Sequence, residues 1–219
     1  MRAFCRGTHG FLQTIDECIT TIFESKIELP GAGEVNKYFF EAFKSVWDGG
    51  ISEDFLSLKK QHPSYELWVT GYSLGGSMAS IASTYIVSSG LFKASKVKLI
   101  TFGEPRTGDH EFATVHGQLL YYTYRVVHQN DLVPHVPIKN YRGYYHHLYE
   151  LKVARYQALL TSSIADIIQV WYNNSMEIGD EFVVCSTAET ESCSDSVKRK
   201  VSLKHHLTYF GERVTEFCL

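Results

Sequence analysis

The hydrophobic positions along the chain repeat with helical spacing in some segments and form short continuous runs in others. Apolar residues at helical spacing predict an amphipathic helix over 11–23, where Thr14-Ile15-Asp16-Glu17 has the pattern of a capping box. A second helix is predicted from Val35 to Trp47 and ends at Gly49-Gly50. A shorter helix is predicted from Ser52 to Gln61.

Runs rich in β-branched and aromatic residues alternate with these helices. They predict strands over 67–70, 97–102, 121–127 and 143–153, and a further helix is predicted from Tyr156 to Tyr172. The chain has no internal repeat and no low-complexity linker. The alternation therefore favours one α/β domain over the full 219 residues.

One turn between a predicted strand and a predicted helix carries a distinctive pattern. Gly71-Tyr72-Ser73-Leu74-Gly75 directly follows the strand over 67–70 and precedes a segment rich in small residues, 74–89. This pattern is typical of a nucleophile elbow, because a cramped strand-to-helix corner needs flanking residues without bulky side chains. An inert serine in a glycine-rich turn is the alternative, and only partner residues elsewhere in the chain distinguish the two.

The composition fits a globular protein and names no partner. Hydrophobic residues make up 44% of the chain, and the formal net charge of -3 argues against a nucleic-acid binder. No apolar run reaches the roughly 18 residues that a transmembrane helix needs, and no signal-peptide core follows the first residues. The five cysteines are an odd number, and Cys185 and Cys193 are spaced to close a short loop.

A serine hydroxyl becomes a useful nucleophile only when a histidine accepts its proton, and a carboxylate usually orients that histidine. In α/β-hydrolases these residues follow one another in the order serine, acid, histidine. Asp131 is the best placed acid, because it follows the predicted strand over 121–127. Asp109 and Glu111 follow an earlier strand, and we expect both to be solvated loop charges.

Several histidines follow the acid. His135 is too close to it to come from a separate loop. His146 and His147 are neighbours in a strand-like run and point to opposite faces, so we expect structural roles for them and no shared metal site. His205 and His206 lie where the chain order predicts the base. Only one of the two can face the serine, and the residues alone leave them tied.

With these residues assembled, the chain resembles the class 3, fungal-type lipase family. Two blocks, 69–76 (VTGYSLGG) and 101–109 (TFGEPRTGD), look like the signatures of that family. The segment 130–134 (NDLVP) resembles its acid segment, and 206–211 (HLTYFG) resembles its histidine segment. The resemblance therefore favours His206 over its neighbour, and the matching segments span nearly the whole chain.

The resemblance implies an α/β-hydrolase fold, with a mostly parallel central sheet flanked by helices. It implies that Ser73 attacks the esters of lipids at a membrane or emulsion interface, with His206 as base and Asp131 orienting it, through an acyl-enzyme. This chemistry requires no cofactor or metal. The alternatives are a phospholipase or small-ester esterase on the same scaffold, or a catalytically impaired lipid-binding protein.

The resemblance also assigns an oxyanion hole and a lid. Arg6-Gly7-Thr8 looks like the family's Arg-Gly-Ser/Thr block, so Thr8 would donate from its backbone N–H and hydroxyl. The backbone N–H of Leu74 would be the second donor, and losing one such donor typically costs about 100- to 1000-fold in rate. Residues 9–30, with the amphipathic segment 11–23, fall where the family carries its lid.

Three features depart from the family pattern. Only five residues precede Arg6, where the family usually has helices and strands, so we expect that the N-terminal portion is missing. Tyr72 replaces a histidine that the family mostly has, and Asn36 replaces another. The resemblance implies a secreted protein, although this chain shows no signal peptide. It leaves open the oligomeric state and the pairing of three cysteines, Cys5, Cys18 and Cys218.

Overall fold

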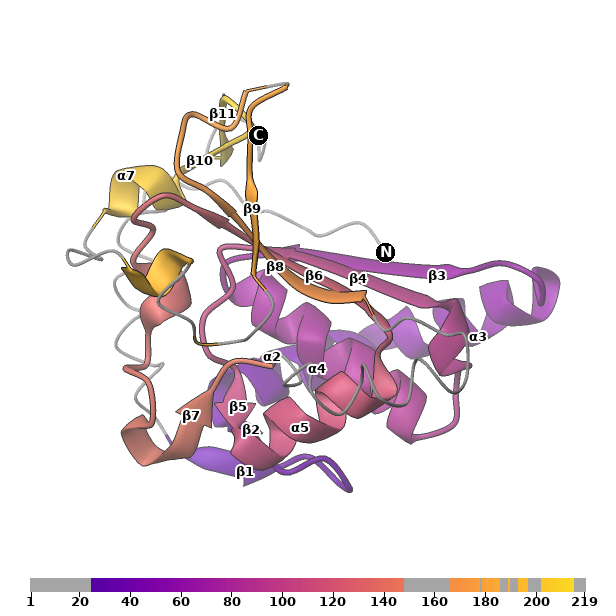
Figure 1. The fold of residues 1–219 in the computed structure, drawn as a ribbon. Helices are drawn as coiled ribbons and strands as arrows, with labels where there is room; N and C mark the ends of the chain where they lie inside the picture. The colour runs from indigo at the N-terminus through magenta and orange to yellow at the C-terminus, as the bar shows by residue number, and fades with distance from the viewer. Residues whose placement is uncertain are drawn as a thin grey trace, which may run out of the picture.

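A five-stranded sheet forms the centre of the computed structural model, which describes residues 25–147, 166–177, 179–185, 189, 193–196 and 202–214. Four neighbouring strands are parallel, and the fifth, β9, pairs antiparallel at one edge (Figure 1). The strand order is β3-β4-β6-β8-β9. The bounds are β3 Leu67–Tyr72, β4 Val97–Phe102, β6 Tyr122–His128, β8 Asp166–Tyr172 and β9 Val183–Cys185.

Helices cover one face of this sheet. Figure 1 shows α2, α4 and α5 together below the strands, with α4 against β3 and β4 and α2 against α4. This arrangement of a mostly parallel sheet flanked by helices is the predicted fold class. The helices are α2 Lys37–Val46, α3 Ser52–Gln61, α4 Leu74–Ser88, α5 His110–Leu119 and the short α7 Leu203–His206.

Two smaller antiparallel sheets complete the described part of the chain. One has the order β1-β2-β5-β7 and lies beyond the helices, and the other is the hairpin of β10 and β11 next to α7 (Figure 1). Their bounds are β1 Lys26–Glu28, β2 Glu34–Asn36, β5 Gly108–Asp109, β7 Tyr144–Tyr145, β10 Thr208–Tyr209 and β11 Glu212–Arg213. Short 3-10 turns lie at Ala94–Lys96, Val133–His135, Tyr141–Gly143 and Ser194–Ser196.

The helix predicted from Val35 is confirmed with a later start. Val35 lies in β2, and the side chain of Asn36 caps α2 by accepting from the backbone N–H of Phe39. As predicted, the glycines at 49–50 end this helix: the chain passes through the turn Trp47–Ile51 before α3 begins. Gly50 has φ +123°, which an L-residue rarely adopts, and so marks a kink between the two helices.

The predicted helix from Tyr156 to Tyr172 is wrong over its last seven residues. These form β8, paired parallel to β6 from Tyr122↔Asp166 to His128↔Tyr172. The segment is rich in isoleucine, valine and aromatic residues, which suit a strand between two others, and a continuous apolar run does not distinguish a helix from a buried strand. Of the predicted strand over 143–153, β7 is the described part that is extended. Residues 148–165 lie outside the described residues.

The main apolar core lies between α2, α3 and α4. The ring of Phe43 lies 5.8 Å from that of Trp47 and 5.5 Å from that of Tyr85, and Trp47 lies 5.6 Å from Phe55. These aromatic contacts fix α2 on α4, the helix that follows Ser73. The core therefore holds in place the helix on which the candidate site is built.

The expected short loop between Cys185 and Cys193 is confirmed. The two cysteines form a disulfide with their Cα atoms 6.1 Å apart, and both are buried against Val127 and Trp171. The bond joins the edge strand β9 to the turn at 194–196. The other three cysteines lie outside the described residues.

Replacing Phe43 with alanine will lower the free energy of unfolding by about 3–5 kcal/mol, because the substitution opens a cavity among aromatic rings. Phe43 is only 2% exposed. Leu58→Ala is the matched control, because Leu58 is 57% exposed and its loss will change stability little. Urea unfolding measures both variants. Equal effects would contradict the assignment of Phe43 to the core.

Candidate active site

Ser73 lies at a sharp corner between β3 and α4. Its backbone has φ 55° and ψ -127°, a strained conformation for a residue other than glycine. A Cβ on Gly71 would lie 2.0 Å from the carbonyl oxygen of Gly75, so the strand and the helix approach too closely for any side chain there. This is the geometry expected of a nucleophile elbow.

The two glycines that flank the serine have different roles. A Cβ on Gly75 would meet nothing within 4 Å, so the expectation that close backbone contact excludes a side chain there is wrong. The next residue, Gly76, has the close approach instead: its Cβ would lie 3.0 Å from the Cβ of Glu104. Close approach therefore requires glycine at position 71 and leaves little room for a side chain at position 76.

Ser73, His206 and Asp131 form one chain of hydrogen bonds, although they are far apart in sequence. The Nε2 atom of His206 lies 2.9 Å from the Ser73 Oγ, and its Nδ1 lies 2.8 Å from the Asp131 Oδ2. A neutral imidazole with its proton on Nδ1 donates to the carboxylate and accepts from the hydroxyl. All three side chains are buried.

The neighbouring histidine is held elsewhere. His205 accepts through Nδ1 from the backbone N–H of Asn130 at 3.2 Å. Burial, followed by the charge of His128, lowers the pKa of His205, which suits this accepting role. The structure thus separates the two histidines that the residues alone leave tied.

Backbone contacts bring the acid loop and the histidine segment together. Asp131 forms an isolated parallel bridge with Ser202, whose backbone N–H donates to the carbonyl of Asn130. The Ser202 side chain caps α7 by accepting from the backbone N–H of His205. The four-residue helix that carries His206 therefore begins at a fixed point beside Asp131.

Tyr209 completes the surroundings of the acid. Its hydroxyl donates to the Asp131 Oδ2 at 2.7 Å, and the backbone N–H of Val133 donates to the other carboxylate oxygen at 2.9 Å. Burial and the adjacent Asp131 charge raise the pKa of Tyr209 well above its ordinary value, so the phenol stays protonated. The sequence analysis did not single out Tyr209, although it lies within the segment 206–211.

Tyr72 contacts His206 in two ways. Its hydroxyl donates to the His206 carbonyl at 2.6 Å, and its ring stacks on the imidazole with centroids 4.9 Å apart. Tyr72, which replaces the histidine that the family mostly has at this position, thus contacts the candidate base directly.

Gly103 leaves room for the histidine and the acid. It has φ +58°, and a Cβ there would lie 2.8 Å from the His206 Cε1 and 3.0 Å from the Asp131 Oδ2. Any side chain at this position would push one of the two groups away.

Glu104 holds a buried polar network beneath the elbow. Its carboxylate accepts hydrogen bonds from Ser80 on α4, from Thr101 on β4 and from Thr107, at 2.6 to 2.8 Å, and lies 2.9 Å from the His147 Nε2. Burial alone would raise the pKa of Glu104, but the charge of His147 and these donors outweigh it and lower the pKa. An ionised Glu104 therefore ties α4 to the end of β4.

The other candidate residues have structural contacts. Asp109 is not the solvated loop charge that we expected: it caps α5 by accepting from the backbone N–H of Phe112. Glu111 is exposed, as expected. His146 lies 2.5 Å from the Pro134 carbonyl through Nε2, while His147 contacts Glu104. Within the described ranges, no three His, Cys, Asp or Glu side chains form a group that would hold a metal.

The oxyanion-hole residues are only partly described. Leu74 is the first residue of α4 and directly follows Ser73, so its backbone N–H is at a helix N-terminus. Thr8 lies outside the described residues, as does most of the candidate lid over 9–30. The described end of that segment contains β1.

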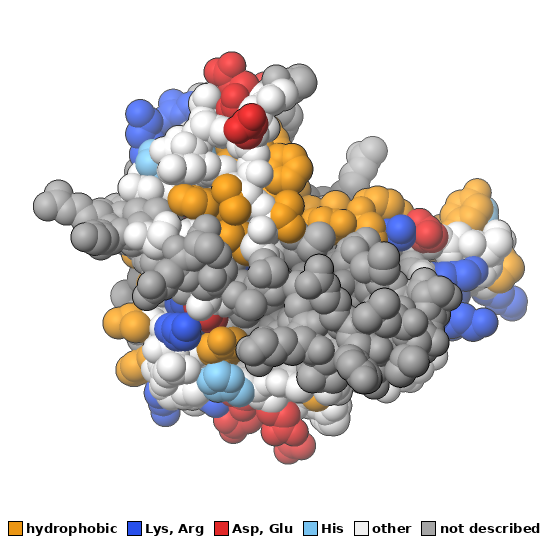
Figure 2. Space-filling model, viewed as in Figure 1, with side chains coloured by type: hydrophobic (Ala, Val, Ile, Leu, Met, Phe, Trp, Pro, Cys, Tyr) orange, Lys and Arg blue, Asp and Glu red, His pale blue; other side chains and the backbone are white. Residues whose placement is uncertain are grey.

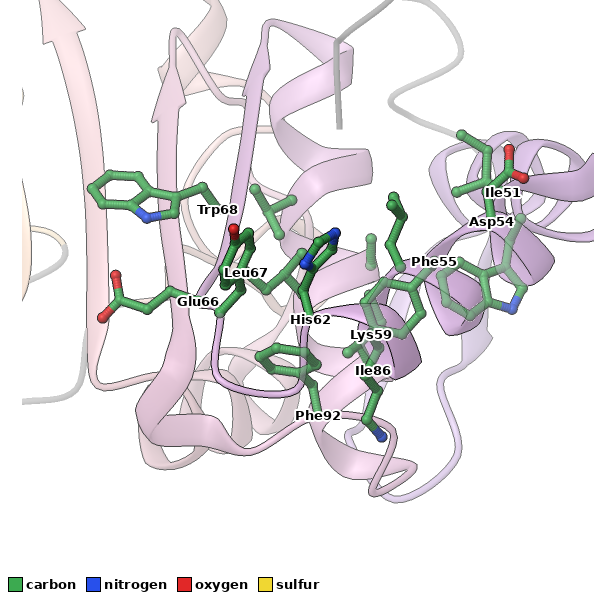
Figure 3. Close-up of a pocket in the computed structure, with 15 residues that line it drawn as sticks. Ile51, Asp54, Phe55, Lys59, His62, Glu66, Leu67, Trp68, Ile86 and Phe92 are labelled. Carbon is green, nitrogen blue, oxygen red and sulfur yellow. The ribbon is translucent and has the colours of Figure 1, made fainter.

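An apolar crevice of about 310 Å³ lies beside the triad. Tyr72 and Tyr209, which contact His206 and Asp131, line it together with Phe102, Phe210, Glu212 and Val214. A separate cavity of about 560 Å³ lies at the opposite end of β3 from Ser73, between that strand and α3. Figure 3 shows Phe55, Ile86 and Phe92 around this second cavity, which contains none of the triad residues.

The fold and the site together define an α/β-hydrolase with a serine, a histidine and an aspartate in hydrogen-bonded sequence. The family model for class 3 lipases matches residues 3–141, more than half of the chain. The chain belongs to the class 3 lipase family.

Known lipases agree with this assignment. The lipase ZK262.3 of Caenorhabditis elegans is 34% identical over 97% of this chain, and the Rhizomucor miehei lipase is 31% identical over 81%. A lipase structure from Rhizopus microsporus var. chinensis has a TM-score of 0.75 at 25% identity, covering 98% of this chain and 66% of that one. A triacylglycerol lipase whose catalytic centre is a serine protease triad has a TM-score of 0.73 at 26% identity, covering 94% and 70%.

The chain is shorter than these relatives. It spans 62% of the length of the nematode lipase and 43% of that of the Rhizomucor miehei lipase.

Replacing Gly103 with alanine will displace His206 or Asp131 and reduce the labelling of Ser73 by a fluorophosphonate at least about tenfold. Gly90→Ala is the matched control. Gly90 has φ +68°, similar to Gly103, but a Cβ there would meet nothing within 4 Å. Both variants carry a similar backbone strain, of about 1–2 kcal/mol. An equal loss of labelling in both would contradict a specific role for the space at Gly103.

The stability difference between wild type and Glu104→Gln will depend on pH. The pKa of Glu104 is lowered from 4.5, so its ionised form stabilises the folded state above that pH, and this contribution is lost as the pH falls through the lowered folded-state value. Urea unfolding at several pH values measures the difference. Glu111→Gln, at an exposed carboxyl, is the control. A difference that stays constant down to about pH 3 would contradict the ionised network.

Proposed function

We propose that the protein hydrolyses carboxylic esters of lipids, with Ser73 as nucleophile. The observation that carries the proposal is the hydrogen-bonded chain from the Ser73 Oγ through the His206 imidazole to Asp131, at 2.9 and 2.8 Å. This arrangement supplies what a serine needs for acyl transfer: a base within reach and a buried carboxylate that orients the base.

In the proposed reaction, the Ser73 Oγ attacks the ester carbonyl carbon while His206 Nε2 accepts the hydroxyl proton. His206 then returns the proton to the leaving alcohol, and an acyl-enzyme remains on Ser73. A water molecule, deprotonated by His206, attacks the acyl-enzyme, and His206 returns that proton to the Ser73 Oγ as the fatty acid is released. Asp131 stabilises the imidazolium formed in each half of the reaction. No cofactor takes part.

We assign the oxyanion hole to Leu74 and Thr8. The backbone N–H of Leu74 follows the nucleophile at the start of α4, where the helix dipole favours a negative oxygen. Thr8 and the lid over 9–30 enter this proposal through the family resemblance.

A lipid substrate fits the apolar surroundings of the site. The crevice beside the triad is lined by aromatic side chains, and Phe210 at its rim is 48% exposed. Phe182, whose ring lies 5.4 Å from that of Tyr172, is also exposed, at 52%, and Figure 2 shows hydrophobic side chains gathered along the sheet. Such surfaces support binding to acyl chains at a membrane or emulsion interface.

An extracellular location is part of the proposal. A secreted mono- and diacylglycerol lipase of Fusarium solani is 35% identical over 47% of this chain. The disulfide between Cys185 and Cys193 also suits an oxidising compartment. No helix among the described residues is long and apolar enough to cross a membrane.

Replacing Ser73 with alanine will reduce ester hydrolysis by about a millionfold, because the nucleophile is removed. The measurement is hydrolysis of esters with short to long acyl chains, with and without an emulsified interface. Ser88→Ala is the matched control, since Ser88 is an exposed serine at the end of the same helix.

Equal rates in wild type and Ser73→Ala would contradict the mechanism. A folded wild type that neither hydrolyses esters nor reacts with a fluorophosphonate would indicate a lipid-binding protein. A preference for short soluble esters without a rate increase at an interface would identify an esterase, and selective hydrolysis of phospholipids a phospholipase.

A further inference from the structure

Three contacts to backbone carbonyls hold the turn that carries His206. The Nδ1 atom of His128 lies 3.0 Å from the carbonyl oxygen of His205 and 2.6 Å from that of Thr208. The Tyr72 hydroxyl donates to the carbonyl of His206 between them. Side chains on β6 and β3 therefore fix the backbone on both sides of the candidate base.

The other ring nitrogen of His128 also faces a carbonyl. Its Nε2 lies 2.9 Å from the oxygen of Asn174, in the loop after β8. Carbonyl oxygens only accept hydrogen bonds, whereas a neutral imidazole has one N–H group and one unprotonated nitrogen. His128 is only 3% exposed, so water does not replace a missing partner. Both contacts are hydrogen bonds only when both ring nitrogens carry a proton.

We propose that His128 is a positioning residue for the reaction: an imidazolium that donates from both nitrogens and fixes the turn of His206 to β6 and to the loop after β8. The inference rests on the proposed function, because it concerns the placement of the candidate base. His128 itself does not touch the substrate.

Other titratable side chains lie around His128. The rings of His205 and Tyr209 face it, with centroids 5.2 and 5.8 Å away. Burial and then the His128 charge lower the pKa of His205, and Lys204 adds to this effect, while Asp131 opposes it. A neutral His205 keeps its accepting bond from Asn130, so the two adjacent imidazoles do not compete for the same proton.

The contacts that His128 makes with this turn matter for the rate, because the base must stay within hydrogen-bond distance of Ser73. A displacement of about 1 Å at a catalytic group can cost on the order of 100-fold in rate. Without donors on residue 128, the part-buried carbonyls of His205 and Thr208 would lose these partners, and the turn would shift toward water to hydrate them.

The first experiment observes the protonation state in the wild-type full chain. Long-range ¹H–¹⁵N NMR spectra at neutral pH, with His128 assigned by its loss in His128→Gln, report whether each ring nitrogen carries a proton. We expect both nitrogens of His128 to be protonated. A neutral His128 ring at this pH would overturn the proposal whatever the variants do.

The second experiment compares the variants His128→Gln and His128→Leu with His110→Gln, at an exposed histidine outside the site. We expect His128→Leu to lower kcat about 10- to 100-fold while KM changes less than about threefold, because the positioning of the base is lost and substrate binding is kept. Glutamine has an amide donor, so His128→Gln will recover part of kcat. Fluorophosphonate labelling of Ser73 will fall in parallel.

Two outcomes separate this inference from the proposed function. A wild type without esterase activity but with a doubly protonated His128 contradicts the proposed function and leaves the contact itself supported. An active wild type with unchanged kcat in His128→Leu contradicts the positioning role. If His128→Leu does not fold, as judged by circular dichroism, the decision rests on His128→Gln and on the NMR measurement. Either an unchanged kcat in His128→Gln or a neutral ring in the wild type then overturns the proposal.

Discussion

The close backbone approach of β3 and α4 at Gly71 is the constraint on which the site depends. It leaves no room for a Cβ and turns the chain sharply enough to hold Ser73 at φ 55°. The strained backbone of Ser73 persists only because contacts on several sides hold α4 in place. Aromatic contacts from α2 hold one side of that helix, and the Glu104 carboxylate holds Ser80 on another.

Two buried carboxylates, Asp131 and Glu104, support the site at two different depths, and each accepts several hydrogen bonds. Near the serine, the carboxylate of Asp131 accepts from His206, from Tyr209 and from a backbone N–H. Beneath the elbow, Glu104 has a similar set of donors and no contact with the serine. Two buried carboxylates thus serve the same corner, one through the base and the other through the helix.

The sequence predicted the parts of this structure that depend on local chemistry. The elbow, the helix from Ser52 to Gln61 and the acid after β6 follow from short patterns along the chain. The helix prediction is wrong over 166–172 for a non-local reason: pairing with neighbouring strands makes this apolar segment extended. Tyr72, Tyr209 and Glu104 lie in recognised motifs, but their partners are brought together by the fold, and no spacing along the chain reveals those contacts.

The bridge between Asp131 and Ser202 has a mechanical consequence. The acid and the base are joined by that bridge, by the bond from Asn130 to His205 and by the bond from Tyr209 to Asp131. The nucleophile stands on the corner of β3 and α4 and is linked to this unit through Tyr72, whose hydroxyl and ring contact His206. A change at Tyr72 would therefore alter the distance from Ser73 to His206 more than the distance from His206 to Asp131, which several bonds hold.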